Sequence, residues 1–244
     1  MLFRSEKFLL RGSEELVNSN PDNKKKNPMY QRIWTMVYSF LMFILVRNAV
    51  QYALLALLYQ LAQSGASGGL VDLLILRDET GAYNGYSGDV SSIIAALGFI
   101  GGALAVWSTA KLLITNNKED MHLSHLKKEG KAKYALLVAV TIGAVIGFNL
   151  LFELLGVTNK SEAYTEVASQ QYSAHFMVGI LVFGFISPIA EELLFRGVIY
   201  GYLRRFMDIK LAIALSALIF GVYHMNYVQG VYGFLIGCLM AYAY

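Results

Sequence analysis

The sequence predicts an all-α polytopic membrane protein, a transmembrane bundle with about six spans, and three observations carry that prediction. The 244 residues are 56% hydrophobic and 15% charged, with a mean hydropathy of +0.49, whereas a soluble domain carries about 25% charged residues. Apolar runs near the ~20 residues that cross a bilayer recur along the chain. Because Cys238 is the single cysteine, a disulfide-rich secreted scaffold is excluded.

A polar, basic segment precedes the first apolar run. Residues 1–29 contain three consecutive lysines and the helix breakers Pro21 and Pro28, but no apolar stretch as long as a signal-peptide core. We therefore expect an uncleaved basic N-terminal segment over residues 1–29, followed by one transmembrane helical domain over residues 30–244.

Six apolar runs follow, and each is expected to form a helix. The candidate spans are Tyr30–Leu61, Val90–Ile114, Tyr134–Leu155, Phe176–Tyr200, Leu211–Tyr227 and Val228–Tyr244. The first is too long for one perpendicular crossing, which predicts tilt or an interfacial extension. It contains Arg47, for which we expect a structural role in the bundle interior, or snorkelling. The loop between Gln63 and Asp89 is rich in Gly, Ser and Asn, which predicts irregular turns.

Lysine and arginine residues collect on one side of the predicted spans. With the N-terminus in the cytoplasm, sixteen of them fall in cytoplasmic segments and two, Arg77 and Lys160, fall outside. Because cytoplasmic loops carry the excess of basic residues, we expect an integral membrane protein with a cytoplasmic N-terminus. The formal net charge of +3 is too small to indicate nucleic-acid binding.

Four ionisable residues fall within the late spans, where a charge costs at least ~2.5–3.5 kcal/mol and is a functional candidate by default. Glu192 and Arg196 are four residues apart and can pair along one helix face. Glu191 lies about 100° away around the helix and keeps no partner nearby in sequence. The fourth residue is His224 in the next span, and Phe220 shares its helix face, so that ring can wall the imidazole.

Pro188 predicts an irregular helix beside Glu191. A proline cannot donate to the carbonyl of Gly184, which frees an acceptor and bends the helix. Irregular backbone within a membrane is tolerated only where protein or a water-filled cavity satisfies it. A desolvated carboxylate beside such a cavity is suited to general acid–base catalysis. We therefore expect a polar site that combines Glu191 with His224.

The strings Glu191-Glu192-x-x-x-Arg196 and Phe220-x-x-x-His224 resemble the first two motifs of the CPBP family. These are the CAAX proteases and bacteriocin-processing enzymes, or Abi proteins, and they include the Rce1-type prenyl-protein endopeptidases. The apolar stretch at residues 234–237 resembles the weaker feature that follows. The resemblance covers residues 176–244, and it implies a helical bundle, usually of about eight helices, with a polar intramembrane site toward the cytoplasmic side.

By this resemblance Glu191 would activate the hydrolytic water as general base, and His224 would orient that water or donate to the oxyanion. Glu192 and Arg196 would shape and support the site. The resemblance thus implies an intramembrane endopeptidase, in a bacterial cell membrane, that acts in peptide maturation or bacteriocin self-immunity. Its peptide or protein substrate would reach the site from the bilayer or the cytoplasmic face.

The last family motif, a second His followed one turn later by Asn or Asp, does not occur before Tyr244. We therefore expect either a truncated chain or an incomplete copy, and Asn226, two residues after His224, cannot replace the missing pair.

No cofactor is expected. The zinc motif HExxH is missing, and Glu191 with His224 supplies two ligands where catalytic zinc takes three, so a divalent metal such as zinc is the disfavoured alternative. Nucleotide and nucleic-acid motifs are missing as well. A second interpretation stays open: a non-catalytic membrane scaffold, regulator or small transporter, in which the same polar residues tie helices together.

Overall fold

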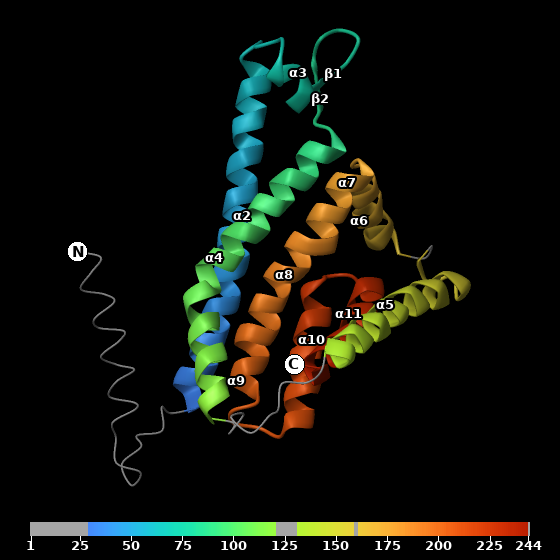
Figure 1. Ribbon diagram of the computed structural model, residues 1–244. Helices are drawn as coiled ribbons and strands as arrows, with labels where there is room; N and C mark the ends of the chain where they lie inside the picture. The colour runs from blue at the N-terminus through green and yellow to red at the C-terminus, as the bar shows by residue number, and fades with distance from the viewer. Residues whose placement is uncertain (1–28, 121–130, 159–160, 244) are drawn as a thin grey trace, which may run out of the picture. The chain divides into compact units, whose positions relative to one another are not determined.

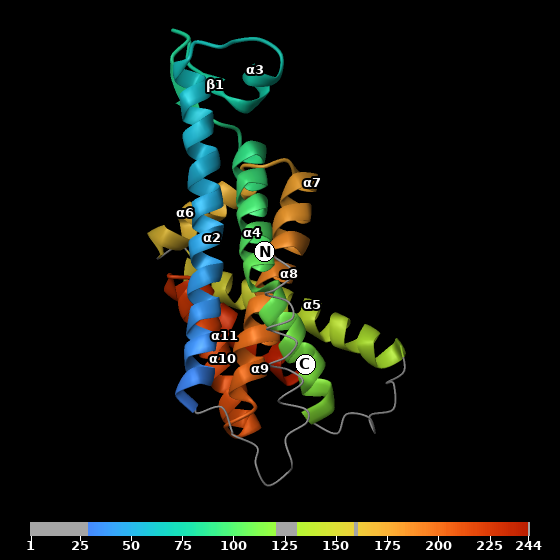
Figure 2. The same cartoon turned by 90° about the vertical axis from the view of Figure 1, so that its left-hand side faces the viewer.

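The computed structural model describes residues 29–120, 131–158 and 161–243, so the basic segment expected over residues 1–29 lies, apart from Met29, outside the described residues. The chain divides into two units, residues 1–35 and 36–244, and the packing described below is that of the second. Helices dominate it (Figure 1 and, turned by 90°, Figure 2), which confirms the predicted all-α class.

All six predicted spans are helical. Among the described residues, four helical stretches are long and apolar enough to cross a membrane, and two shorter apolar helices follow them. The long ones are α2 (Met29–Gln63), α4 (Gly88–Asp120), α5 (Lys131–Leu154) and the continuous run over residues 176–203. The shorter ones are α10 (Ile209–Tyr223) and α11 (Tyr227–Ala243). The bounds agree with the apolar runs to within a few residues, except that α4 extends well beyond Ile114.

The run over residues 176–203 changes its hydrogen-bonding pattern along its length. It comprises α7 (Phe176–Gly179), the π-helix η4 (Ile180–Ile186), α8 (Ser187–Glu192), the π-helix η5 (Leu193–Tyr200) and α9 (Gly201–Leu203). At the end of η4 the backbone N–H of Ser187 donates to the carbonyl of Val182, five residues back. Pro188 then falls in the first turn of α8, where its missing N–H is tolerated. The irregularity expected at Pro188 thus takes the form of wider turns, and the helix continues past it.

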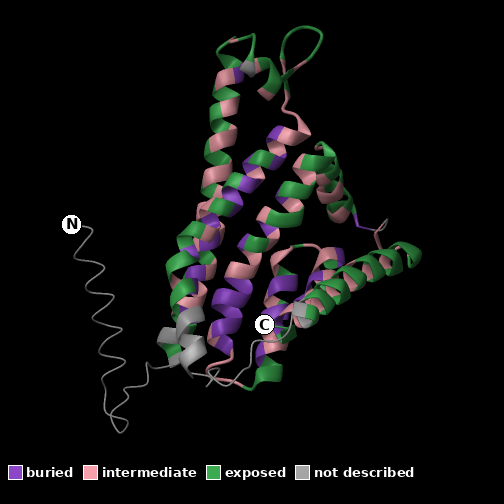
Figure 3. Cartoon of the chain, viewed as in Figure 1, coloured by how far each residue is buried: buried purple, intermediate pink, exposed green. Residues whose placement is uncertain are grey.

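The buried core of the second unit is centred on η5. Every residue from Leu194 to Tyr200 is buried, and Figure 3 shows this stretch as an almost unbroken purple segment. The ring of Phe195 meets Phe220 edge to face with centroids 4.7 Å apart, and Phe40 at 6.3 Å. Such close packing holds membrane helices together. Because η5 directly follows Glu191 and Glu192, its packing fixes the position of the helix that carries these two residues.

Helices α10 and α11 approach each other closely. A Cβ atom on Gly221 would lie 2.5 Å from the carbonyl oxygen of Gly230, so this approach requires glycine. In the turn between the helices, Met225 has the left-handed φ of 58° that usually favours glycine after a helix. Asn226 caps α11 by accepting from the backbone N–H of Gln229 at 2.8 Å, and its amide donates to the carbonyl of His224 at 3.2 Å.

The segment between α2 and α4 differs from the expected irregular turns. It contains the short helix α3 (Leu70–Leu74) and an antiparallel pair of strands, β1 (Leu76–Arg77) and β2 (Tyr83–Gly85). The carboxylate of Asp78 closes the hairpin by accepting from the backbone of Thr80 at 2.9 Å and of Ala82 at 3.0 Å. Together with a hydrogen bond from the Thr80 hydroxyl, these bonds lower the pKa of Asp78.

A polar helix, α6 (Glu162–Tyr172), precedes α7 and was not predicted. Ser161 caps its first turn by accepting from the backbone N–H of Tyr164 at 3.2 Å. No residue of α6 is buried. Because the helix needs no apolar face, its sequence contains no apolar run that would predict it.

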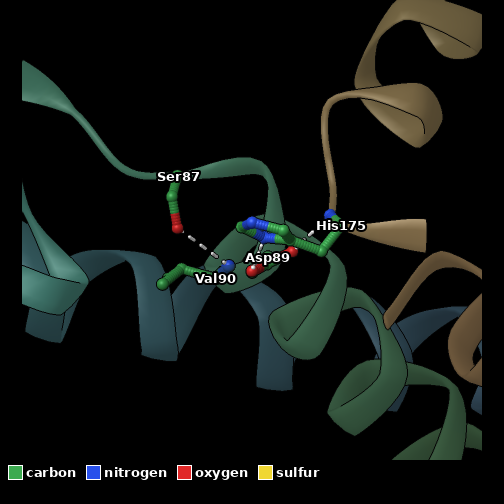
Figure 4. A network of polar contacts seen from close by, with 4 residues as sticks. All are labelled: Ser87, Asp89, Val90 and His175. Atoms are coloured by element: carbon green, nitrogen blue, oxygen red, sulfur yellow. Dashed lines mark hydrogen bonds and ion pairs between the residues drawn. The ribbon is translucent and has the colours of Figure 1, made fainter. Parts of the chain in front are cut away.

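A carboxylate clamp joins the beginnings of α4 and α7 (Figure 4). Asp89 accepts from the backbone N–H of His175 at 2.6 Å, and its other oxygen lies 2.5 Å from Nδ1 of the same histidine. Ser87 caps α4 by accepting from the backbone N–H of Val90 at 3.4 Å. The clamp therefore fixes the spacing between α4 and the helical run that begins with α7, and both α4 and the later part of that run line the cavity described next.

Candidate active site

A cavity of about 1100 Å³ lies between α2, α4, α6, α8 and the turn that joins α10 to α11. Its lining is mixed, with carboxylate, guanidinium, hydroxyl, amide and imidazole groups among apolar side chains. Glu191 and His224 both line it. The structure therefore brings together the two residues that the sequence predicts to act as a pair.

Glu191 reaches the cavity from α8 and is not directed at lipid. The hydroxyl of Ser187, one turn earlier, donates to its carboxylate at 3.3 Å. The guanidinium of Arg47, on α2, lies close enough to attract this carboxylate electrostatically. A half-buried carboxylate with one weak donor and a nearby cation can hold a water molecule and accept a proton from it.

His224 ends α10, and its ring orientation is fixed from two sides. Its Nδ1 lies 2.9 Å from the carbonyl oxygen of Phe220, which can only accept, so Nδ1 carries the proton in the neutral ring. The ring of Phe220 stands edge to face against the imidazole at 4.8 Å, as the four-residue spacing predicts. In the neutral state Nε2 is therefore an acceptor, which suits it to orient water and leaves it without a proton for an oxyanion.

Glu192 and Arg196 form the predicted ion pair, with the nitrogen and oxygen atoms 3.0 Å apart. The Arg196 side chain is 3% exposed, donates to the carbonyl of Gly237 at 3.2 Å, and lies 4.8 Å from the centroid of the Phe220 ring. Neither member of the pair lines the cavity, and Phe220 does not either. These three residues tie η5 to α10 and α11 behind the residues that face the cavity.

Arg47 lies at the cavity as well, where the sequence suggests only a structural or snorkelling residue. Its Nη1 donates to the hydroxyl of Tyr223, and its guanidinium carbon lies 4.3 Å from the centroid of the Phe99 ring. A Cβ atom on Gly98 would lie 2.9 Å from the carbonyl oxygen of Arg47, so this glycine lets α4 approach α2. The available signal was the presence of a charge inside a predicted span.

Tyr223 is the second cavity residue that the sequence analysis missed. It directly precedes His224, and its ring packs against Phe195 at 5.3 Å and against the imidazole at 5.5 Å. A tyrosine in an apolar helix is common, so nothing in the sequence distinguishes this one from the other fifteen.

The described part of the chain contains no group of three His, Cys, Asp or Glu side chains placed to hold a metal ion. The carboxylate, imidazole, hydroxyl and amide groups that line the cavity can support general acid–base and hydrogen-bond chemistry.

Comparison with known proteins gives a match to a protein family. Residues 173–244 match the family model described as type II CAAX prenyl endopeptidase Rce1-like. The matched segment contains Glu191, Glu192, Arg196, Phe220 and His224, which confirms the resemblance to the CAAX proteases. No curated protein and no solved structure matches the chain.

Proposed function

We propose that this integral membrane protein hydrolyses a peptide bond within the membrane, as the match of residues 173–244 to the Rce1-like type II CAAX prenyl endopeptidase model suggests. The observation that carries the proposal is that Glu191 and His224, both from the matched segment, line one polar cavity. That juxtaposition supplies the two groups needed to place and activate a water molecule.

In this mechanism Glu191 is the general base and takes a proton from water as the water oxygen attacks the scissile carbonyl. His224 orients the water through Nε2, because its Nδ1–H is held by Phe220. The protonated Glu191 then returns the proton to the leaving amine. Glu192, Arg196 and Phe220 position the two helices and do not touch the reacting atoms.

The same proposal assigns the surroundings of the reaction. The N-terminus is in the cytoplasm of a bacterial cell, and the substrate reaches the cavity from the bilayer or the cytoplasmic face. Three substrate classes fit: a prenylated C-terminus, a peptide leader and a short membrane peptide. Of these, the latter two correspond to peptide maturation or bacteriocin self-immunity. The reaction uses neither a metal cofactor nor a nucleic-acid partner.

The proposal is tested with the full chain in proteoliposomes. One internally quenched peptide of each substrate class is supplied, and products are identified by mass spectrometry. We expect Glu191→Gln to lower the rate by about 10²–10⁴-fold, the usual contribution of a general base. Glu153→Gln is the matched control, because this carboxylate is exposed near the end of α5 and lies outside the cavity.

Three outcomes would contradict the proposal. Full activity of Glu191→Gln would remove the assigned base. A folded wild-type protein that cleaves no peptide class would favour the scaffold or transporter, for which the helix-tying Glu192–Arg196 pair is the supporting observation. A rate that falls on chelation and returns with added zinc would overturn the metal-independent mechanism.

A further inference from the structure

The cavity wall carries a permanent positive charge that comes from outside the matched segment. We propose that Arg47, on α2, is a positioning residue that sets the protonation states of the two catalytic residues, holding Glu191 ionised and His224 neutral. This inference rests on the proposed function, because it concerns the two residues assigned there. Arg47 itself lies outside residues 173–244, so the match to the family does not supply it.

Within the described part of the chain, the residues that line the cavity include a single cation, Arg47, and a single carboxylate, Glu191. An arginine side chain keeps its proton in proteins, whereas a desolvated carboxyl group keeps its charge only where a partner favours the ionised form. Inside a membrane, charged side chains pair with one another or face a water-filled cavity. Arg47 and Glu191 are therefore the opposite charges of this cavity wall.

The other neighbours of Arg47 are neutral. Its Nη1 donates to the hydroxyl of Tyr223, and its guanidinium carbon lies 4.3 Å from the centroid of the Phe99 ring and 5.7 Å from that of Tyr223. Its Nε is buried and has no hydrogen-bond partner among the described residues. These contacts hold the guanidinium in place but supply no negative charge, which leaves Glu191 as its counter-ion in the cavity.

Arg47 acts electrostatically on both catalytic residues. Of the charged groups that interact with Glu191, Arg47 has the largest effect, ahead of Glu192 and Arg196. The same guanidinium acts on His224, where its like charge opposes a second proton on the ring. Glu192 and Arg196 are paired with each other at 3.0 Å and do not line the cavity. Arg47 is therefore the cation that the base and the imidazole share.

The remaining titratable groups at the cavity are tyrosines, which stay neutral near neutral pH. They come from the loop before α4, from α10 and from α11: Tyr86, Tyr223 and Tyr232. No lysine, aspartate or further arginine of the described residues lines the cavity. Near neutral pH, the charges that face Glu191 and His224 across the cavity are thus their own and that of Arg47.

The two protonation states are those that hydrolysis needs at its start. Glu191 must be ionised to take a proton from water, and His224 must be neutral for its Nε2 to accept a hydrogen bond from that water. A positive charge favours both states at once, because it attracts a carboxylate and repels an imidazolium. Once Glu191 has taken the proton, the same charge favours its release to the leaving amine.

Arg47→Met tests the inference through the pH dependence of kcat/KM, measured with the quenched peptides in proteoliposomes. Removing the cation disfavours ionised Glu191 and favours protonated His224. The acid limb of the profile should therefore move to higher pH by about one unit or more, the usual effect of a neighbouring charge, and activity lost at neutral pH should return as the pH rises. Arg47→Lys keeps a positive charge and should keep the acid limb near its wild-type position. The matched control is Lys111→Met, which removes an exposed cation of α4 outside the cavity and should leave the profile unchanged.

A second readout requires no catalysis. The C=O stretch of protonated Glu191, identified by its disappearance in Glu191→Gln, is followed by infrared spectroscopy as the pH is raised. We expect the midpoint of this titration to move in Arg47→Met in the same direction as the acid limb, and to stay near its wild-type value in Arg47→Lys. Arg47→Gln, which removes the charge but keeps N–H donors, is measured as well, so that the result does not depend on the folding of one variant. Thermal unfolding shows which variants are folded.

These measurements separate the inference from the proposed function. Folded Arg47→Met or Arg47→Gln protein whose Glu191 midpoint and acid limb coincide with those of the wild type overturns the role of Arg47, and the endopeptidase stands. A loss of activity that is equal at every pH assigns Arg47 to structure alone and also overturns it. A wild-type protein that cleaves no peptide, but whose Glu191 midpoint moves when Arg47 is replaced, overturns the proposed function and supports the charge pairing.

Discussion

Replacing Arg196 with methionine is the sharpest test of what holds the site together. The change keeps a long unbranched side chain but removes the guanidinium that pairs with Glu192 and donates to the carbonyl of Gly237. It also removes the cation that lies 4.8 Å from the Phe220 ring. We expect a folded but less stable protein.

The magnitude follows from these three contacts. A hydrogen bond to a charged group is worth about 1.5–3 kcal/mol, and a partly buried cation–π contact about 1 kcal/mol. Breaking a fully buried ion pair costs about 3–5 kcal/mol, but the Glu192 side chain is 33% exposed, so water can partly compensate its lost partner. We expect a net loss of about 3 kcal/mol, which lowers the melting temperature of a chain of this size by roughly 6–12 °C.

The chain carries its own reporter for this measurement. Cys238, its single cysteine, directly follows Gly237 on α11 and is partly buried. A thiol-reactive fluorogenic maleimide therefore reports when α11 separates from η5 as the purified protein is heated in detergent. Lys111→Met, on an exposed part of α4, removes a cation without breaking a buried contact and serves as the control.

A double variant distinguishes the loss of the ion pair from a general loss of folding. Glu192→Gln combined with Arg196→Met should recover part of the loss, because no unpaired carboxylate then remains. An Arg196→Met protein that melts with the wild type would show that the ion pair contributes nothing. A double variant no more stable than Arg196→Met would show that the hydrogen bond to Gly237, and not the pair, carries the effect.

Three further variants test the packing around the cavity, each by thermal or denaturant unfolding. Gly221→Ala should destabilise by about 1–3 kcal/mol through overpacking, because its Cβ would meet the carbonyl of Gly230 at 2.5 Å; unchanged stability would mean that α10 and α11 separate freely. Asp89→Asn should lower the melting temperature, and adding His175→Ala should lower it little further, since one clamp joins the two residues; additive losses would contradict the clamp. Met225→Gly should raise the free energy of unfolding by about 0.5–1 kcal/mol, because an exposed L residue at φ 58° is strained; a loss would show that this side chain contributes contacts.

The local sequence pattern predicts those features that depend only on residues close together within one helix. The six apolar runs became helices because bilayer thickness and internal hydrogen bonding leave few other solutions. The Glu192–Arg196 pair and the Phe220–His224 contact followed from the spacing of four residues. Pro188 marked the place where the hydrogen bonding changes, but not the π-helical form of the change.

The rest of the site depends on contacts that no local pattern reports. Arg47 and Tyr223 are 176 positions apart, and the packing of α10 against both α2 and η5 brings them together. The polar helix α6 and the two short strands carry no apolar run or long alternation. Ser161, a good N-cap residue followed by Glu162, was the one available signal for α6.

The cavity is walled partly by the segment that matches the family model and partly by helices and loops that precede it in the chain. The segment over residues 173–244 contributes the base and the imidazole, while Arg47, Gln51, Ser92 and Phe99 come from α2 and α4. Proteins that share the matched segment can therefore differ in the shape and polarity of the opposite wall. Exchanging α2 and α4 together between such proteins would change the cavity wall opposite Glu191 and His224 while leaving those two residues untouched.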